Sequence, residues 1–162
     1  MSITIEEGYA PGCIGRVTQL HAEYYAGNHG FGVPFEAKVA QELAKFCLAF
    51  EPDRDGLWLV RDPVIQGSIA IDGSKASGGC AHLRWFITSD ALRGQGIGRL
   101  LLARALAFAD TKGYQSIQLW TFAGLDAARH LYEAHGFRLV EQNAGSTWGK
   151  VVEEQRFVRN VA

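Results

Sequence analysis

Hydrophobic positions along the chain follow two periods, and the changes between them mark out the elements. Alternation with a period of two predicts strands, whereas apolar residues three or four positions apart predict helices. A glycine-rich interruption at Gly27–Gly32 separates two helical patterns near the N-terminus. In order, the first part predicts a strand at Ile3–Glu6, a helix beginning near Ile14 and running through Tyr24, and a second helix opened by Pro34 and reaching Phe50.

The remaining chain alternates strand and helical patterns, with no internal repeat. Glycines or a proline mark several of the boundaries, as at Asp62-Pro63, Gly113 and Gly136. The predicted elements are strands at Leu57–Val60, Val64–Ile71 and Cys80–Thr88, a helix at Ile97–Lys112, a strand at Ser116–Phe122, a helix at Leu125–His135, and final strands at Phe137–Val140 and Val151–Val158.

Composition narrows the class of protein. The chain has 162 residues, of which 48% are hydrophobic and 20% charged, so we expect one globular domain over residues 1–162. A net charge of -1 lacks the basic footprint of a nucleic-acid binder. We also see no apolar stretch that would span a membrane and no leader-like segment at Met1–Tyr9, and we expect a cytoplasmic protein.

The cysteines carry no predicted chemistry. Cys13, Cys47 and Cys80 are odd in number, widely spaced and without histidines at metal-ligand spacing, which disfavours both zinc and a disulfide scaffold. Cys47 lies in an apolar helical pattern and is interpreted as a small buried hydrophobe.

The strongest chemical signal is the glycine turn Arg93–Gly98. The turn follows a predicted strand and opens a predicted helix, so backbone N–H groups of the first helical turn can face an anion such as phosphate. Arg93 and Arg99 can add charge to the same site. A tight strand-to-helix turn without a ligand is the alternative. The glycine spacing fits neither the dinucleotide fingerprint nor the P-loop.

Two segments resemble the GNAT superfamily of N-acetyltransferases. The stretch Phe86–Leu101 resembles the family's acetyl-CoA signature, R/Q-x-x-G-x-G/A, and Leu131–Phe137 resembles its "lYe..GF" element. His82–Phe86 and Trp120–Arg129 are further similar to the acetyltransferase half of MarR-type fusion proteins. The chain departs from the family at Leu125, where most members carry Asn seven residues before the tyrosine.

The resemblance implies a fold and a cofactor. The fold is α/β, with a mixed, mostly antiparallel, splayed sheet of about seven strands flanked by four helices. The cofactor is acetyl-CoA, with coenzyme A held by the strand end and the turn. The residues so implied are Phe86, Ile87, Thr88, Arg93, Gly94, Gln95, Gly96, Ile97, Gly98 and Arg99.

Acetyl transfer needs a proton donor for the departing thiolate and a base for the amine. The resemblance places Tyr132 as the general acid; the alternative is a core tyrosine on an amphipathic helix. His82 is the first candidate for the base, because histidine titrates near neutral pH and alternation puts His82, Arg84 and Phe86 on one face. A carboxylate acting through water stays open, with candidates Glu23, Glu36 and Glu133.

The acceptor side is predicted from cations and aromatics. Arg84, inside an apolar strand, suits a substrate carboxylate, or else pairs with an acidic residue of the chain. Trp120 is expected beside the acceptor groove. Tyr24 and Phe31, around the flexible glycines, are expected in a wall over the acceptor, as in relatives, or alternatively in the core.

The leading hypothesis is therefore an enzyme that moves acetyl directly from acetyl-CoA to the primary amine of a small molecule, such as an amino acid or other zwitterion. A catalytically weak acyl-CoA sensor and a protein acetyltransferase are the alternatives. No nucleic acid, membrane or metal is expected as a partner, and the final strands can pair across a homodimer.

Overall fold

The computed structural model describes residues 2–161 as a seven-stranded sheet with helices on both faces. The strands lie in the order β1-β2-β3-β4-β5-β7-β6, and every neighbouring pair is antiparallel except β4 and β5. The elements are β1 (Thr4–Glu7), α1 (Cys13–His29), α2 (Val33–Leu48), β2 (Gly56–Arg61), β3 (Ile65–Asp72), β4 (Cys80–Thr88), α3 (Ile97–Thr111), β5 (Ser116–Phe122), α4 (Asp126–Ala134), β6 (Arg138–Gly145) and β7 (Val152–Asn160).

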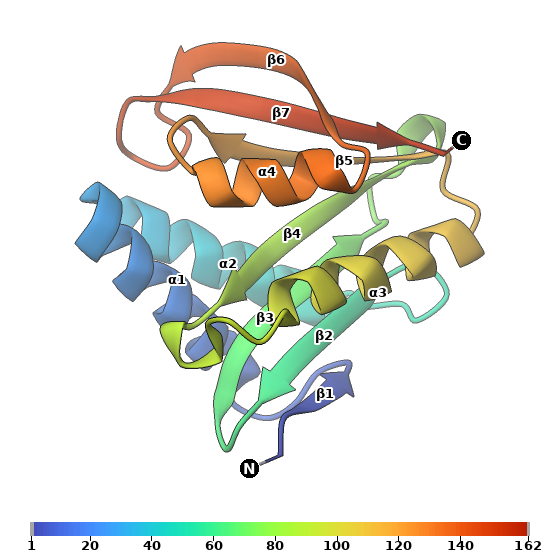
Figure 1. Ribbon diagram of the computed structural model, residues 1–162, viewed down its shortest axis with the longest axis horizontal. Helices are drawn as coiled ribbons and strands as arrows, with labels where there is room; N and C mark the ends of the chain where they lie inside the picture. The colour runs from blue at the N-terminus through green and yellow to red at the C-terminus, as the bar shows by residue number, and fades with distance from the viewer. Residues whose placement is uncertain (1, 162) are drawn as a thin grey trace.

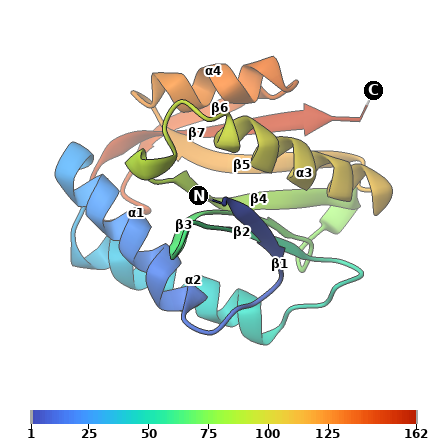
Figure 2. The same ribbon diagram turned by 60° about the horizontal axis from the view of Figure 1, so that its bottom comes forward.

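The predicted fold class is confirmed, and the helices divide into two layers. Figure 2 shows α3 and α4 on one side of the sheet and α1 and α2 on the other, and Figure 1 shows the same elements face-on. Each layer has its own core, because the two faces of the sheet bury different side chains. Any ligand that passes between strands therefore meets both cores.

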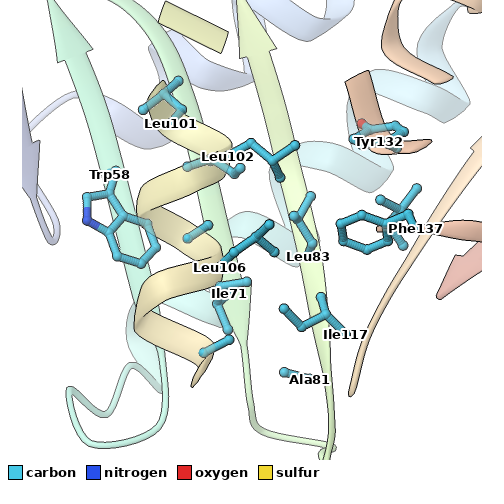
Figure 3. Packing of buried hydrophobic residues seen from close by; sticks show 14 of the residues in the cluster. Trp58, Ile71, Ala81, Leu83, Leu101, Leu102, Leu106, Ile117, Tyr132 and Phe137 are labelled. Atoms are coloured by element: carbon cyan, nitrogen blue, oxygen red, sulfur yellow. The ribbon is translucent and has the colours of Figure 1, made fainter. Parts of the chain in front are cut away.

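The core on the α3 side is built from the helical stripe that the sequence predicts. Leu101, Leu102 and Leu106 of α3 pack against strand residues that include Ile71 and Leu83 (Figure 3). Leu101 and Leu102 are fully buried. A leucine-to-alanine change at such positions costs about 2–5 kcal/mol of unfolding free energy, so α3 is a firm base for the turn that precedes it.

Two predicted boundaries differ from the structure. Helix α1 continues to His29, through Gly27, and ends where Gly30 takes a left-handed conformation with φ of 70°. A single helical glycine costs only about 1 kcal/mol, which tertiary packing outweighs. Strand β6 extends to Gly145 rather than stopping at Val140, because pairing with β7 satisfies the backbone of its polar half.

Candidate functional site

Strands β4 and β5 separate and open the sheet. They pair only at Cys80–His82 with Ser116–Gln118, and β4 then runs on to Thr88 while it stays paired with β3. The backbone of β4 beyond His82 therefore faces β5 without a ladder among the described residues. Such an edge can offer hydrogen bonds to an extended ligand laid between the two strands.

A β-bulge at Trp85 accompanies the opening. Trp85 has φ of 48°, and the β3–β4 register shifts between Ser68 and Ala70, so that two residues of β4 oppose one of β3. The Ser68 hydroxyl donates a 2.6 Å hydrogen bond to the Trp85 carbonyl oxygen and fixes the bulge.

The bulge corrects the predicted alternation along β4. Phe86 packs in the core on the α3 side, with its ring 6.1 Å from that of Tyr132, whereas Trp85 belongs to the core on the α1 and α2 side. The prediction that His82, Arg84 and Phe86 share one face is thus wrong for Phe86. The extra residue reverses the alternation, and Arg84 and Trp85 come to lie together, with the guanidinium carbon 4.2 Å from the Trp85 ring centroid.

A cavity of about 790 Å³ lies across the opening. Its walls come from α1, α2, β4, β5 and the loop between β6 and β7, and Tyr132 of α4 reaches it from the opposite side of the sheet. This volume lies within the range of small-molecule sites. Of the predicted site residues, it brings together His82, Arg84, Phe86, Trp120 and Tyr132.

The glycine turn has the geometry that the anion hypothesis requires. Gly96 caps α3 in a left-handed conformation with φ of 70°, and Gly94 has φ of 79°. Within residues 2–161, the backbone N–H groups of Gly94–Arg99 donate to no backbone acceptor, and the first such bond comes from Leu100 to Gly96. Neither glycine has a neighbour within 4 Å of where a Cβ would stand. A bare row of donors at the positive end of a 15-residue helix fits the pyrophosphate of acetyl-CoA.

The other predicted cofactor residues divide between exposure and burial. Gln95 and Arg99 are exposed, and Arg93 is exposed with an ion pair to Asp90. The Ile97 side chain is buried in the core, so only its backbone can face a ligand. Ile87 and Thr88 pair with β3 through Ser68 and Gly67 at the end of β4 that precedes the turn.

Tyr132 belongs to the core on the α3 side and also lines the cavity. Figure 3 shows it beside Phe137, and its side chain is 7% exposed. Burial raises the pKa of the phenol above its ordinary value of 10, and the charge of Tyr25 adds to the shift. The hydroxyl therefore keeps its proton at neutral pH and can act only as a donor or a neutral acceptor.

His82 lies in a charged network on the α2 side of β4. Burial and, after it, the neighbouring Arg84 cation together lower the pKa of His82 to about 4, although Asp72 and Glu42 act in the opposite direction. Arg84 pairs with Glu42 of α2 and, at 3.5 Å, with Asp72 of β3. Of the two interpretations of Arg84, the structure thus shows the ion pair within the chain.

The carboxylates of this network are held in their charged forms. Burial alone would raise the pKa of Glu42, but the hydrogen bond from Lys38 and the charge of Arg84 outweigh it and lower the pKa. Asp72 behaves alike: burial would raise its pKa, and hydrogen bonds from Ser74 together with Arg84 lower it. The ion pair between Glu42 and Arg84 thus connects α2 to β4.

Another histidine with a lowered pKa, His21 of α1, is buried and should make the folded protein less stable in acid. Its Nδ1 donates a 2.8 Å hydrogen bond to the Val17 carbonyl, and burial lowers its pKa from 6.5 to about 4. Between pH 6.5 and pH 4, this histidine is protonated in the unfolded chain and neutral in the folded chain. The free energy of unfolding is therefore expected to fall as pH drops from 6.5 to 4, by about 3 kcal/mol from this residue.

Urea unfolding at pH 7 and pH 4.5 measures this loss, and His21→Gln should shrink the difference between the two midpoints. The control is His130→Gln, at an exposed position of α4, which should leave the difference unchanged. Equal losses in both variants would rule out His21 as the source.

Two predicted acceptor-wall residues are corrected. Tyr24 is 41% exposed and does not line the cavity; its neighbour Tyr25 does. Phe31 is 4% exposed and packs in the core with Phe35 and Phe122, so the core alternative holds for it.

The loop between β6 and β7 forms part of the cavity wall through Thr147 and Trp148. Trp148 packs on Phe122 at 5.9 Å between ring centroids, and Lys150 donates a 2.6 Å hydrogen bond to the carbonyl oxygen of His29 at the end of α1. Nothing in the sequence pattern indicated this long-range contact.

The three alternative carboxylate bases lie elsewhere. Glu23 and Glu36 line a separate groove on the outer side of α1 and α2, and Glu133 pairs with Arg129 on the surface of α4. Glu42 and Asp72, which the sequence analysis did not single out, are the carboxylates beside His82. A charged residue on the apolar face of a predicted helix was the available signal for Glu42.

The fold combines a sheet opened between β4 and β5, a turn with unpaired backbone N–H groups and a cavity across the opening. The chain matches the model of the acetyltransferase (GNAT) family over residues 16–137, and it belongs to that family. No helix within residues 2–161 is long and apolar enough to cross a membrane. The finer likeness to MarR fusion proteins stays a prediction.

Solved structures share the fold at low identity. A GNAT acetyltransferase from Staphylococcus aureus Mu50 is 17% identical, with a TM-score of 0.78 and coverage of 99% of this chain and 100% of that one. An IAA acetyltransferase from Bacillus cereus is 17% identical (TM-score 0.68; 99% and 100% covered), and a variant of spermidine N-acetyltransferase from Vibrio cholerae is 18% identical (TM-score 0.69; 97% and 94% covered). The chain has no match among curated proteins.

Proposed function

We propose that the protein is an acetyl-CoA-dependent N-acetyltransferase that acetylates the primary amine of a small molecule by direct transfer. The observation that carries the proposal is the cavity that joins Tyr132 to the open edge of β4, the strand that leads into the unpaired N–H groups of the glycine turn. When bound, acetyl-CoA supplies an activated acetyl group as a thioester.

Different groups of the chain would bind the cofactor and supply the proton. The N–H groups from Gln95 to Arg99 bind pyrophosphate oxygens, and the free backbone of β4 orients the extended arm of the cofactor. Tyr132, kept protonated by burial, donates a proton to the departing sulfur. An oxyanion at the reacting carbonyl would take its hydrogen bonds from the same strand.

His82 would accept the amine proton. A pKa of about 4 leaves its imidazole neutral at pH 7 and able to accept. The low basicity suffices late in the reaction, because an amine nitrogen becomes much more acidic as it bonds to a carbonyl carbon. No cysteine nucleophile is required, and Cys13, Cys47 and Cys80 are free thiols outside the cavity lining.

A small acceptor is favoured over a protein. The Lys150 contact holds the β6–β7 loop against the end of α1, the Trp148 contact holds it against Phe122 of β5, and Trp148 lines the cavity. We infer that this wall admits a small amine more readily than the lysine side chain of a folded protein.

The test is thiol release from acetyl-CoA against a panel of amines, amino acids and lysine peptides, with thermal unfolding measured in CoA. Release with a small amine but not with peptides supports the proposal. A thermal shift with CoA and no release with any acceptor favours the acyl-CoA sensor, and no shift at all contradicts the cofactor.

A further inference from the structure

Some charged side chains that line the acceptor cavity form ion pairs, and others do not. Its lining carries four carboxylates, and each is engaged by groups of the chain. Glu42 pairs with Lys38 and Arg84, and Asp72 accepts from Ser74 and Arg84. A cationic ligand entering the cavity must therefore displace an existing partner from either of them.

The remaining two carboxylates also accept hydrogen bonds from groups of the chain. Asp55, 2% exposed, accepts from the backbone N–H groups of Glu51 and Gly73 and from Arg54. Glu154 accepts from the backbone and the hydroxyl of Thr147. Asp55 thus pairs with a cation, whereas Glu154 bonds only to Thr147 and, within residues 2–161, forms no ion pair.

Two cations of the lining have no acidic partner. Within residues 2–161, neither Lys45 of α2 nor Lys75 of the β3–β4 turn forms an ion pair, whereas Lys38, Arg54 and Arg84 all do. Two unpaired lysines stand against one unpaired carboxylate, Glu154, so the unpaired charge of the lining is net positive.

Both lysines lie at the same end of the cavity. Arg54 donates a 2.9 Å hydrogen bond to the Ala49 carbonyl at the C-cap of α2, and the next residue, Asp55, accepts a 2.8 Å hydrogen bond from the Gly73 N–H, so the end of α2 lies near the start of the β3–β4 turn. Lys75 is close enough to His82 to influence its titration. Tyr132 reaches the cavity at the opening between β4 and β5, beyond the paired end of the two strands. The cavity thus runs from the acetyl-transfer position to a pair of free cations.

Resting on the proposed function, we infer that the acceptor is an amino-carboxylate whose carboxylate binds Lys45 and Lys75 while its amine points to the opening beside Tyr132. The amine attacks the thioester carbonyl and passes a proton to His82, the C–S bond breaks, and the departing sulfur takes a proton from Tyr132. A polyamine of similar length would place its far ammonium group beside these two lysines, which repel it. Arg84, already paired with Glu42 and Asp72, positions the wall and is not the carboxylate ligand.

The experiment compares acceptors of equal length that differ only in the far group: ω-amino acids, their amides, and α,ω-diamines. Thiol release should be most efficient with the carboxylate, at least tenfold in kcat/KM over the amide, and lowest with the diamine. Added salt should raise KM for the carboxylate series, because exposed lysines are screened.

The variant Lys45→Gln/Lys75→Gln should raise KM for ω-amino acids about tenfold at unchanged kcat, and leave KM for the amides unchanged. The control is Lys112→Gln, at a lysine that lies over Phe108 at the end of α3, outside the cavity. Release with diamines as efficient as with ω-amino acids, or an unaffected double variant, would overturn the inference and leave the proposed function standing. No release with any acceptor would instead sink the proposed function, and the inference with it.

Discussion

Replacing Tyr132 by phenylalanine is expected to lower kcat for acetyl transfer by about a hundredfold or more, with little effect on folding. Loss of a positioned general acid typically costs about 10²–10⁴ in rate. The phenol is buried and its pKa is raised, so at pH 7 it is a protonated donor facing the cavity. Phenylalanine keeps the ring packing on Phe137 and Phe157 while it removes the donor.

The measurement is steady-state thiol release at saturating acetyl-CoA, beside the urea midpoint and the CoA thermal shift of the variant. Both binding and stability should stay near those of the parent chain. Tyr114→Phe serves as the matched control. Tyr114 lies outside the cavity lining, and its hydroxyl donates a hydrogen bond to the Arg54 carbonyl. A Tyr132→Phe enzyme with parental kcat would show that another group protonates the sulfur.

The variant Gly96→Asp is expected to weaken CoA binding by about a hundredfold or more. A carboxylate at the cap of α3 would place like charge beside the pyrophosphate, and such juxtaposition costs several kcal/mol. Asparagine and aspartate tolerate the left-handed backbone best among residues with a Cβ, and space at Gly96 is open, so folding should survive.

Gly113→Asp separates backbone strain from charge. Gly113 has φ of 83° and no neighbour within 4 Å of a Cβ, but it lies at the opposite end of α3. Both variants should lose about 1 kcal/mol of unfolding free energy to the strained backbone, with a larger loss for Gly113→Asp because a carboxylate is unfavourable at a helix C-terminus. Isothermal titration with CoA should find weakened binding for Gly96→Asp alone. Equal affinities in the two variants would exclude the turn as the pyrophosphate site.

Local signals explain what the sequence predicts well. The turn and α3 follow from glycines and a leucine stripe within one segment, and the structure places them within a residue of their predicted bounds. The opened sheet follows from the family resemblance, and the order of elements agrees with it. The turn and α3 depend on neighbours close in the chain, which a sequence pattern records directly.

Long-range contacts explain what the sequence could not predict. The bulge at Trp85 adds one residue to β4, and a period of two shows no sign of such an insertion until the register with β3 is known. The partner of Arg84 is Glu42, on another element. In α1, Tyr24 and Tyr25 both fit a helical stripe, and only packing against Phe35 and Phe122 decides which faces the cavity.

The central claim is that one cofactor lies between β4 and β5, with its pyrophosphate on the glycine turn and its sulfur near Tyr132. A crystal structure of the complex with acetyl-CoA tests it most directly. The account predicts pyrophosphate oxygens within hydrogen-bond distance of the N–H groups of Gln95–Arg99 and a thioester within reach of the Tyr132 hydroxyl. Acetyl-CoA bound away from this opening, or a thioester that Tyr132 cannot contact, would contradict it.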